Sequence, residues 1–367
     1  MAFSGEYAHF SSLEFSTGEL TGAIGDSITV LPLLVALAAT TSVSLAHVFL
    51  AFGIFQIVWG LFYGMPISLE PMKALVGLAI VGALSYPELI GAGLLAGGVL
   101  LVVGWLGLVG RLQRVVGEPV VRGIQLAVAF LLLEAAFGLS LEALPVALAG
   151  LALVGFMVVA GYRNASSIVV LVVGGAIAVS LAGFPSPRLP SMTFFPAGGP
   201  MVSADALEAT GAQLGMTIGN AAIATAVLAG DLYNRQLSPD QLSRSMGITC
   251  LAAVPIGGIP MCHGSGGLAG KYAFGAKTAG ANVFLGIGYL ALSLLAIGAL
   301  LAAFPLALLG VLLAIVGFEL ARAALVPLST SHEGAIAVVI GLLGLFGNVG
   351  LAFVVGILLW QILVQFR

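Results

Sequence analysis

The stretch Gly64-Met-Pro-Ile-Ser-Leu-Glu-Pro-Met-Lys-Ala-Leu-Val-Gly-Leu-Ala-Ile80 is apolar at both ends and polar in its middle. Its prolines, Pro66 and Pro71, remove backbone donors and favour extended geometry in the residues before them. We therefore expect an extended run from Met65 to Glu70 and then a short helix starting near Pro71, because proline suits the first helical position. The first amides of such a helix lack partners and carry partial positive charge, so this stretch predicts an anion site.

A second stretch, Gly257-Gly-Ile-Pro-Met-Cys-His-Gly-Ser-Gly-Gly-Leu-Ala-Gly-Lys271, has the same design. Its triplet Gly258-Ile-Pro260 corresponds to Gly64-Met-Pro66, and each triplet precedes a short polar run and a helix of small residues. The triplets lie 194 residues apart, about half the chain. In transporters, interrupted segments at matching positions of two halves indicate the substrate site.

The composition is that of an integral membrane protein. Of the 367 residues, 60% are hydrophobic and 7% are charged, whereas about 25% are charged in soluble domains. Apolar runs of membrane length recur along the whole chain. The small net charge indicates no nucleic-acid partner. Cys250 and Cys262 lie in apolar surroundings and predict neither a disulfide framework nor a zinc site, so we expect no metal and no cofactor.

We expect an all-α membrane fold with fourteen segments. The longest connection, residues 184–205, separates a first set of seven (20–183) from a second set (206–367), and residues 1–19 form an N-terminal tail. The third and tenth segments are the interrupted ones. The segments are roughly 20–39, 44–63, 65–83, 87–109, 119–138, 142–160, 166–183, 206–229, 240–257, 259–276, 280–301, 305–324, 333–348 and 350–365.

The basic residues are distributed as a fold with fourteen membrane segments requires. With the N-terminus in the cytoplasm, nine lie on the inner side and only Arg188 lies in an outer loop, which agrees with the positive-inside rule. Both termini are then cytoplasmic, and we expect a prokaryotic inner or plasma membrane. Seven segments per half give the halves opposite topology, which is the inverted-repeat plan. The inner residues are Arg111, Arg114, Arg122, Arg163, Arg235, Arg244, Lys277, Arg322 and Arg367.

Polar residues also interrupt the first and eighth segments, at Gly25-Asp-Ser-Ile-Thr29 and Gly215-Met-Thr-Ile-Gly-Asn220. Ionisable side chains within a membrane are costly and indicate functional sites by default. Some have structural alternatives: Asp26 as a helix cap, Lys271 extending to the cytoplasmic surface, and His263 as a packed polar residue. The full set of candidates is Asp26, Glu70, Lys73, Glu134, His263, Lys271 and Glu319, of which Glu134 and Glu319 also fit the headgroup region.

Residues 65–73, 119–126 and 260–278 resemble signatures of the molybdate transporter type 1 family, distant relatives of the SulP sulfate permeases, and residues 25–32 are similar to its first-span motif. The resemblance extends from about residue 20 to 365. It implies molybdate uptake, with tungstate or sulfate as further substrates. It also implies the fourteen-span, seven-plus-seven fold of SulP and nucleobase transporters. A core domain (spans 1–4 and 8–11) then moves against a gate domain (5–7 and 12–14), usually in a homodimer.

Two positions depart from the family pattern. The family commonly has Gln where this chain has Glu70, and the family's Gly-Asp-Leu-Gly-Thr is replaced by Gly-Asp-Ser-Ile-Thr at 25–29. An acid at position 70 adds a protonation step or lowers the affinity for a dianion.

These observations predict a tetrahedral dianion held between the starts of the third and tenth segments. Backbone amides near Met72, Lys73 and Gly264–Gly266 donate to it, and the small Gly residues allow close approach. A proton carried by Glu70 or Asp26 is the expected coupling ion, because burial favours a neutral carboxylate; sodium coupling and uniport remain open. The predicted binding residues are Ser27, Thr29, Glu70, Pro71, Met72, Lys73, Gln213, Thr217, Asn220, Cys262, His263, Gly264, Ser265 and Gly266.

Three alternatives remain. A sulfate transporter needs the same site, because sulfate is also a tetrahedral dianion. A nucleobase transporter shares the fold, but the eighth segment offers Gln213, Thr217 and Asn220 and no carboxylate for a base. An intramembrane enzyme that uses Cys262 and His263 is disfavoured, because the side chains of adjacent residues diverge. We therefore expect a transporter with no catalytic residues.

Overall fold

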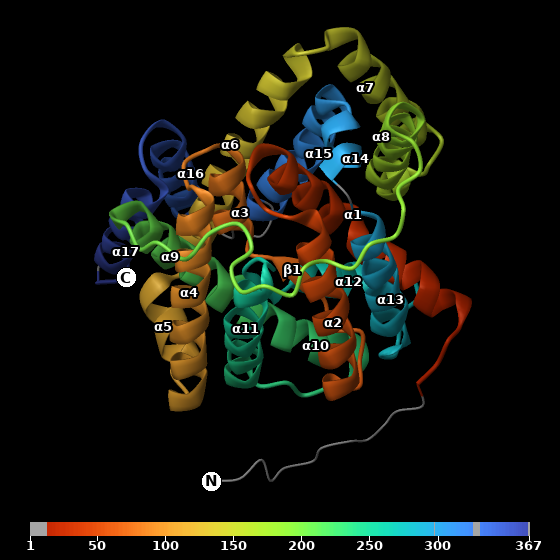
Figure 1. Cartoon of the computed structure of the whole chain (residues 1–367). Helices are drawn as coiled ribbons and strands as arrows, with labels where there is room; N and C mark the ends of the chain where they lie inside the picture. The colour runs from red at the N-terminus through yellow and green to blue at the C-terminus, as the bar shows by residue number, and fades with distance from the viewer. Residues whose placement is uncertain (1–12, 297, 326–330, 366–367) are drawn as a thin grey trace.

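Apolar runs of the sequence form helices, and the two proline- and glycine-rich stretches form short strands (Figure 1). The computed structural model describes residues 13–296, 298–325 and 331–365. The elements of the first half are α1 (Thr17–Thr40), α2 (Leu45–Tyr63), β1 (Leu69–Pro71), α3 (Lys73–Ile80), α4 (Tyr86–Leu106), α5 (Val109–Val116), α6 (Glu118–Leu141), α7 (Leu144–Val159), the 3-10 turn η1 (Arg163–Ala165) and α8 (Ser166–Ala182).

An extended connection leads from α8 to the second half and passes over the outside of the molecule (Figure 1). The second half contains α9 (Ala204–Met216), the π-helix η2 (Thr217–Ile223), α10 (Ala224–Tyr233), α11 (Pro239–Ala253), the 3-10 turn η3 (Val254–Ile256), β2 (Met261–His263), α12 (Ser265–Ala273), α13 (Gly280–Leu295), α14 (Gly298–Ala303), α15 (Leu306–Leu325), α16 (Ser331–Phe346) and α17 (Val349–Gln365).

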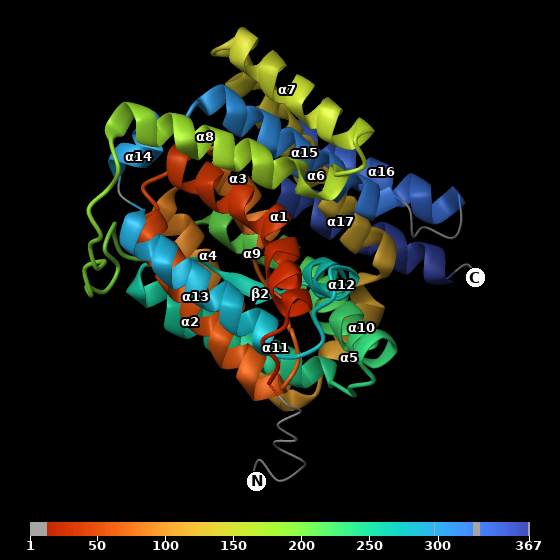
Figure 2. The ribbon, with the colours of Figure 1, turned by 90° about the vertical axis from the view of Figure 1, so that its right-hand side faces the viewer.

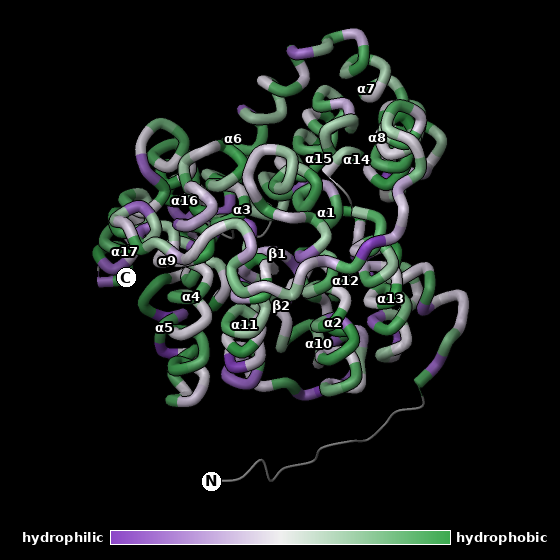
Figure 3. Tube along the Cα trace, in the orientation of Figure 1, coloured by the Kyte–Doolittle hydropathy of each residue, from purple (hydrophilic) through white to green (hydrophobic). Residues whose placement is uncertain are grey.

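Within the described residues, six helical stretches are long and apolar enough to cross a membrane: α1, α2, α4, α6, α15 and the continuous run from α9 to α10. Five shorter apolar helices of 10–17 residues accompany them. Each of the fourteen predicted segments contains helix, but the number of crossings and the inverted repeat stay predictions. Large apolar side chains such as Trp105, Phe137 and Phe156 are exposed on the outside, and hydrophobic residues follow most of the helix surfaces (Figure 3). Such a surface suits contact with lipid.

The helices pack in two groups. In one group, α6 packs against α15 and α16; in the other, α2 packs against α13, and α4 against α11. Figure 2 shows α7, α8 and α15 on one side of α1 and α3, and α2, α11 and α13 on the other side. The N-terminal half of α1 contacts α12 and α13, while α3 contacts α6 and α9. The two short helices therefore lie where the two groups meet.

Three details differ from the sequence expectations, and the change in the eighth segment agrees with them. Pro71 does not start a helix: it ends β1, and α3 begins at Lys73, because Pro71 lies opposite Met261 in the strand pair. The first segment has no break at residues 25–29, since α1 is continuous and contains Pro32. In the eighth segment, the polar stretch does change the helix, into the π-helix η2. The N-terminal tail ends before Thr17, and its residues 1–12 lie outside the described residues.

Candidate substrate site between two interrupted helices

The two interrupted stretches meet in a small antiparallel sheet. Its pairs are Leu69 with His263, Glu70 with Cys262 and Pro71 with Met261, and every residue of both strands is buried. One residue separates each strand from the helix that follows it. Because the strands are antiparallel, α3 and α12 begin at opposite ends of a sheet that is only three residues long, so their N-termini lie close together.

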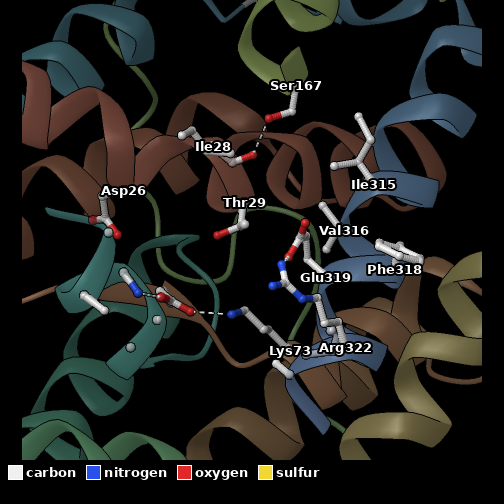
Figure 4. Close-up of a pocket in the computed structure, with 18 of the residues that line it drawn as sticks. Asp26, Ile28, Thr29, Lys73, Ser167, Ile315, Val316, Phe318, Glu319 and Arg322 are labelled. Atoms are coloured by element: carbon white, nitrogen blue, oxygen red, sulfur yellow. Dashed lines mark hydrogen bonds and ion pairs between the residues drawn. The ribbon is translucent and has the colours of Figure 1, made fainter. Parts of the chain in front are cut away.

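A cavity of about 1010 Å³ adjoins this sheet. It is lined by residues of α1, β1, α3, α6, α7, η1, α8, α9, η2, β2, α12 and α15, and Figure 4 draws part of this lining. Ser27 and Met72 do not line it: Ser27 donates to the carbonyl of Ala23 within α1, and Met72 is fully buried. The predicted site residues that do line it are Asp26, Thr29, Glu70, Pro71, Lys73, Gln213, Thr217, Asn220, Cys262, His263, Gly264, Ser265 and Gly266.

The N-terminus of α3 is capped by the protein itself. The Met72 amide donates to the carbonyl of Pro260 (2.9 Å). The amides of Ala74 and Leu75 donate to Oε1 of Gln213 (2.9 and 3.3 Å). The other end of that side chain, Nε2, donates to Oγ1 of Thr217 (2.8 Å). The Met72 amide therefore cannot serve the anion as predicted, and Gln213 binds α3 with its amide group.

The N-terminus of α12 is more open. The Gly267 amide donates to Oε1 of Glu70 (2.8 Å), and Oε2 of Glu70 forms an ion pair with Nζ of Lys73 (2.5 Å). Within the described part of the chain, the amides of Ser265 and Gly266 have no hydrogen-bond acceptor, and both residues line the cavity. Glu70 is buried, whereas Lys73 is partly exposed to the cavity (Figure 4). Two amides and one ammonium group are therefore available to an anion.

His263 is a packed polar residue, which is the structural alternative given for it above. Its Nε2 lies 2.7 Å from Oγ of Ser245, and its Nδ1 lies 3.1 Å from the carbonyl of Ser68. The ring packs edge-on against Trp59 and Tyr63 and is buried. Both nitrogens are therefore occupied by the protein, which fixes β2 against its neighbours.

A second ion pair lies behind the sheet. Asp26 accepts from Ser68 Oγ (2.5 Å) and lies 3.2 Å from Nζ of Lys271. Lys271 is completely buried, so it does not extend to the surface. Gln56 and Asn282 complete this cluster. Sequence reasoning missed them, although a single amide inside an apolar helix, as at Gln56, is a signal that could have been used.

The entrance of the cavity is rich in arginine. Glu319 pairs with Arg163 (2.5 Å) and lies 3.9 Å from Arg322, and all three side chains are exposed. Figure 4 shows Glu319 beside Arg322. Arg122 also lines this end and donates to the carbonyl of Ala323 (3.1 Å). Glu134 is exposed and is not part of the cavity wall. Glu319 thus belongs to the cavity entrance and Glu134 does not.

Polar contacts also link the two helix groups near the cavity. Asn220 of η2 donates to Oε1 of Gln125 on α6 (3.3 Å). Ser167 on α8 donates to the carbonyl of Ile28 on α1 (3.0 Å), as Figure 4 shows. These contacts hold η2 against α6 and α8 against α1 beside the cavity.

Comparisons with known proteins agree on the family. The family described as "Molybdate transporter of MFS superfamily" matches residues 18–132 and 205–320. Molybdate transporter 1 of Arabidopsis thaliana is 29% identical over 94% of this chain and 88% of its own length. Molybdate transporter 2 of the same plant is 28% identical over 95% of this chain and 87% of its own length. Molybdate transporter 1 of Chlamydomonas reinhardtii is 27% identical over 96% and 92%.

Solved structures show the fold. The transmembrane domain of the cyanobacterial bicarbonate transporter BicA matches with a TM-score of 0.68 at 20% identity, covering 95% of this chain and 99% of that chain. The murine anion transporter Slc26a9 in its inward-facing state matches with a TM-score of 0.67 at 16% identity, covering 96% of this chain and 69% of that chain.

The similar curated proteins are plant and algal, so they do not support a prokaryotic membrane. The chain belongs to the molybdate transporter family: it is an integral membrane anion transporter and not an enzyme.

Proposed function

We propose that this protein takes up molybdate and binds the dianion in the cavity between the starts of α3 and α12. The observation that carries this proposal is the pair of open amides at Ser265 and Gly266, next to the ammonium group of Lys73. A helix N-terminus with free amides is a ready anion site, because its N–H groups and its dipole both favour negative charge. Thr29, which also lines the cavity, adds a hydroxyl from α1.

The charges around the cavity suggest how transport is coupled. Lys73 contributes one positive charge and the α12 terminus about half a charge, while ionised Glu70 cancels most of this. A dianion therefore binds best when Glu70 has taken up a proton. Asp26, which is buried beside Lys271, is the other candidate for that proton. We propose proton symport through Glu70.

The division into two helix groups supports alternating access. In this proposal the core domain contains α1 to α4 and α9 to α13, and the gate domain contains α6 to α8 and α15 to α17. The cavity entrance carries Arg122, Arg163 and Arg322, which the positive-inside rule assigns to the cytoplasm. The structure then corresponds to an inward-facing state with both termini cytoplasmic.

The test is uptake of labelled molybdate by proteoliposomes, with and without an inward proton gradient. Competition by unlabelled molybdate and tungstate is expected, and sulfate, which has shorter bonds, is expected to compete less. Stronger competition by sulfate than by molybdate would change the assigned substrate, and competition by uracil or xanthine would favour the nucleobase alternative. Uptake that does not respond to the gradient would remove the proton from the mechanism.

A further inference from the structure

The ammonium group of Lys271 lies in a cage of oxygen atoms behind β1. Its Nζ is 2.8 Å from Oδ1 of Asn282, 3.0 Å from the carbonyl of Ile67, 3.2 Å from Oδ2 of Asp26 and 3.3 Å from Oε1 of Gln56. These oxygens come from α1, α2, α13 and the extended segment before β1. The lysine side chain is 0% exposed.

Other hydrogen bonds orient the cage oxygens toward the ammonium group. The Asn282 amide nitrogen donates to the carbonyls of Gln56 (2.9 Å) and Ile67 (2.8 Å), so its oxygen points to the centre. The Gln56 amide nitrogen donates to the carbonyl of Leu69 (3.2 Å) and to Asp26 (3.3 Å). Because these bonds do not involve Lys271, the oxygens are held in place independently of it.

Two glycines allow the elements around the cage to pack closely together. A Cβ at Gly60 would overlap the side chain of Asn282, so the glycine lets α2 and α13 approach at this point. A Cβ at Gly267 would overlap Ser68, Asp26 and Glu70 together. The cage thus lies directly behind Glu70 and the start of α12, within one side chain of the proposed molybdate site.

The same oxygen donors can also coordinate an alkali cation. One carboxylate, two amide oxygens and one main-chain carbonyl provide oxygen ligands and a single negative charge, which suits a monovalent ion better than a divalent one. In transporters with interrupted helices, Na⁺ is bound by such oxygens next to the substrate. Here the tip of a lysine occupies the centre instead.

We propose that Lys271 is a built-in cation at a position that can hold Na⁺, and that removing its ammonium group exposes a sodium site. The positive charge next to the anion is then part of the protein. Molybdate transport by the natural protein consequently needs no Na⁺. The role in transport rests on the proposed function, whereas the site itself can be tested without any substrate.

The experiment compares the natural protein, Lys271→Ala and the double variant Asp26→Asn/Lys271→Ala in NaCl and in choline chloride of equal ionic strength. Thermal unfolding is measured on each purified protein without substrate, and labelled molybdate uptake is measured in proteoliposomes. We expect NaCl to raise the unfolding temperature of Lys271→Ala in a concentration-dependent way, since a ligand that binds the folded state stabilises it. The natural protein should not respond.

In uptake, we expect Lys271→Ala to lose about 100-fold in choline, because the buried Asp26 carboxylate then lacks its cationic partner. We expect it to recover at least about tenfold in NaCl, since Na⁺ restores that partner. The double variant is the matched control: it lacks the carboxylate and should gain nothing from Na⁺ in either assay. If the natural protein transports no molybdate, the proposed function fails, and the unfolding measurements still decide the sodium site.

Two results would overturn the inference. One is a natural protein whose uptake or stability depends on Na⁺, because its cage is then not occupied by Lys271 alone. The other is a Lys271→Ala protein that Na⁺ neither stabilises nor reactivates, including one that cannot be recovered folded in NaCl or in choline. An equal response of the single and double variants to Na⁺ would count as the second result.

Discussion

The two interrupted helices have the same layout but present different chemistry to the cavity. Each follows a three-residue strand, each N-cap residue has extended backbone, and neither helix exceeds nine residues. The amides of α3 are capped by Gln213 and by the carbonyl of Pro260. At α12 the cap is Glu70, which binds the Gly267 amide and leaves those of Ser265 and Gly266 open.

The difference shows that one backbone arrangement can be used in two ways. The start of α3 carries Lys73, whose side chain supplies a positive charge. The start of α12 is rich in glycine, so its main chain is accessible and its amides are the donors. Binding then needs both halves, with the charge from one and the hydrogen bonds from the other.

The largest loss of molybdate affinity is expected for Lys73→Met. This change removes the charge from the α3 side and leaves Glu70, which is 4% exposed, without its partner. Breaking a charge pair of this kind costs about 2–5 kcal/mol, so the Kd should rise about 100-fold. Calorimetric titration of molybdate into purified protein measures it, and Lys73→Arg is the control that keeps the charge. A Kd within a factor of three of the natural value would show that α12 binds the anion alone.

A smaller loss is expected when the α12 side is blocked at Gly266. A Cβ there would meet no atom within 4 Å, so Gly266→Ala places a methyl group in open cavity space beside the free amides. Loss of charge-assisted hydrogen bonds worth about 1.5–3 kcal/mol should weaken binding about 30-fold. Gly270→Ala is the matched control, because its Cβ would meet only the carbonyl of Gly25 at 3.8 Å. Equal affinities for the two variants would contradict a role for these amides.

The sequence predicted the paired interruptions well. Proline and glycine act locally on the backbone, so Pro66, Pro71 and Gly257–Gly258 were enough to indicate two breaks. The family resemblance was confirmed by the matching family and relatives. The π-helix at Thr217–Ile223 also follows from a polar stretch that the sequence shows.

The sequence does not predict which residues form hydrogen bonds and ion pairs with one another inside the protein. The ammonium group of Lys271 binds four oxygens from elements between 11 and 245 residues away in the chain, and no local pattern encodes such distant contacts. The same holds for Gln213, whose oxygen caps α3 from 138 and 139 residues away. Free and capped helix starts look alike in sequence, which is why Met72 was expected to bind the anion.

A gain rather than a loss is expected for Glu70→Gln. The amide oxygen can still accept from the Gly267 amide, as Oε1 of Glu70 does, while Lys73 is released from its ion pair. Removing a negative charge beside a dianion should tighten binding about fivefold at neutral pH. Because Glu70 is the proposed proton carrier, uptake by the variant should no longer respond to the proton gradient that drives uptake by the natural protein.

Calorimetric titration of molybdate into both proteins tests the affinity, and uptake with and without a proton gradient tests the coupling. Glu319→Gln is the control, because Glu319 is exposed at the cavity entrance and pairs there with Arg163. A Glu70→Gln protein whose uptake still follows the proton gradient would assign the proton to another group.

The smallest change in affinity is expected for Gln213→Leu, and it separates the two helix starts most directly. The substitution leaves the amides of Ala74 and Leu75 buried without their acceptor, which costs about 1–3 kcal/mol of folding free energy. Thermal unfolding should therefore occur at a lower temperature, while the Kd for molybdate changes by no more than about twofold, because these amides do not contact the anion. If the Kd falls markedly instead, the freed α3 amides bind molybdate, and the two helices act as equivalent donors rather than as a charge on one side and amides on the other.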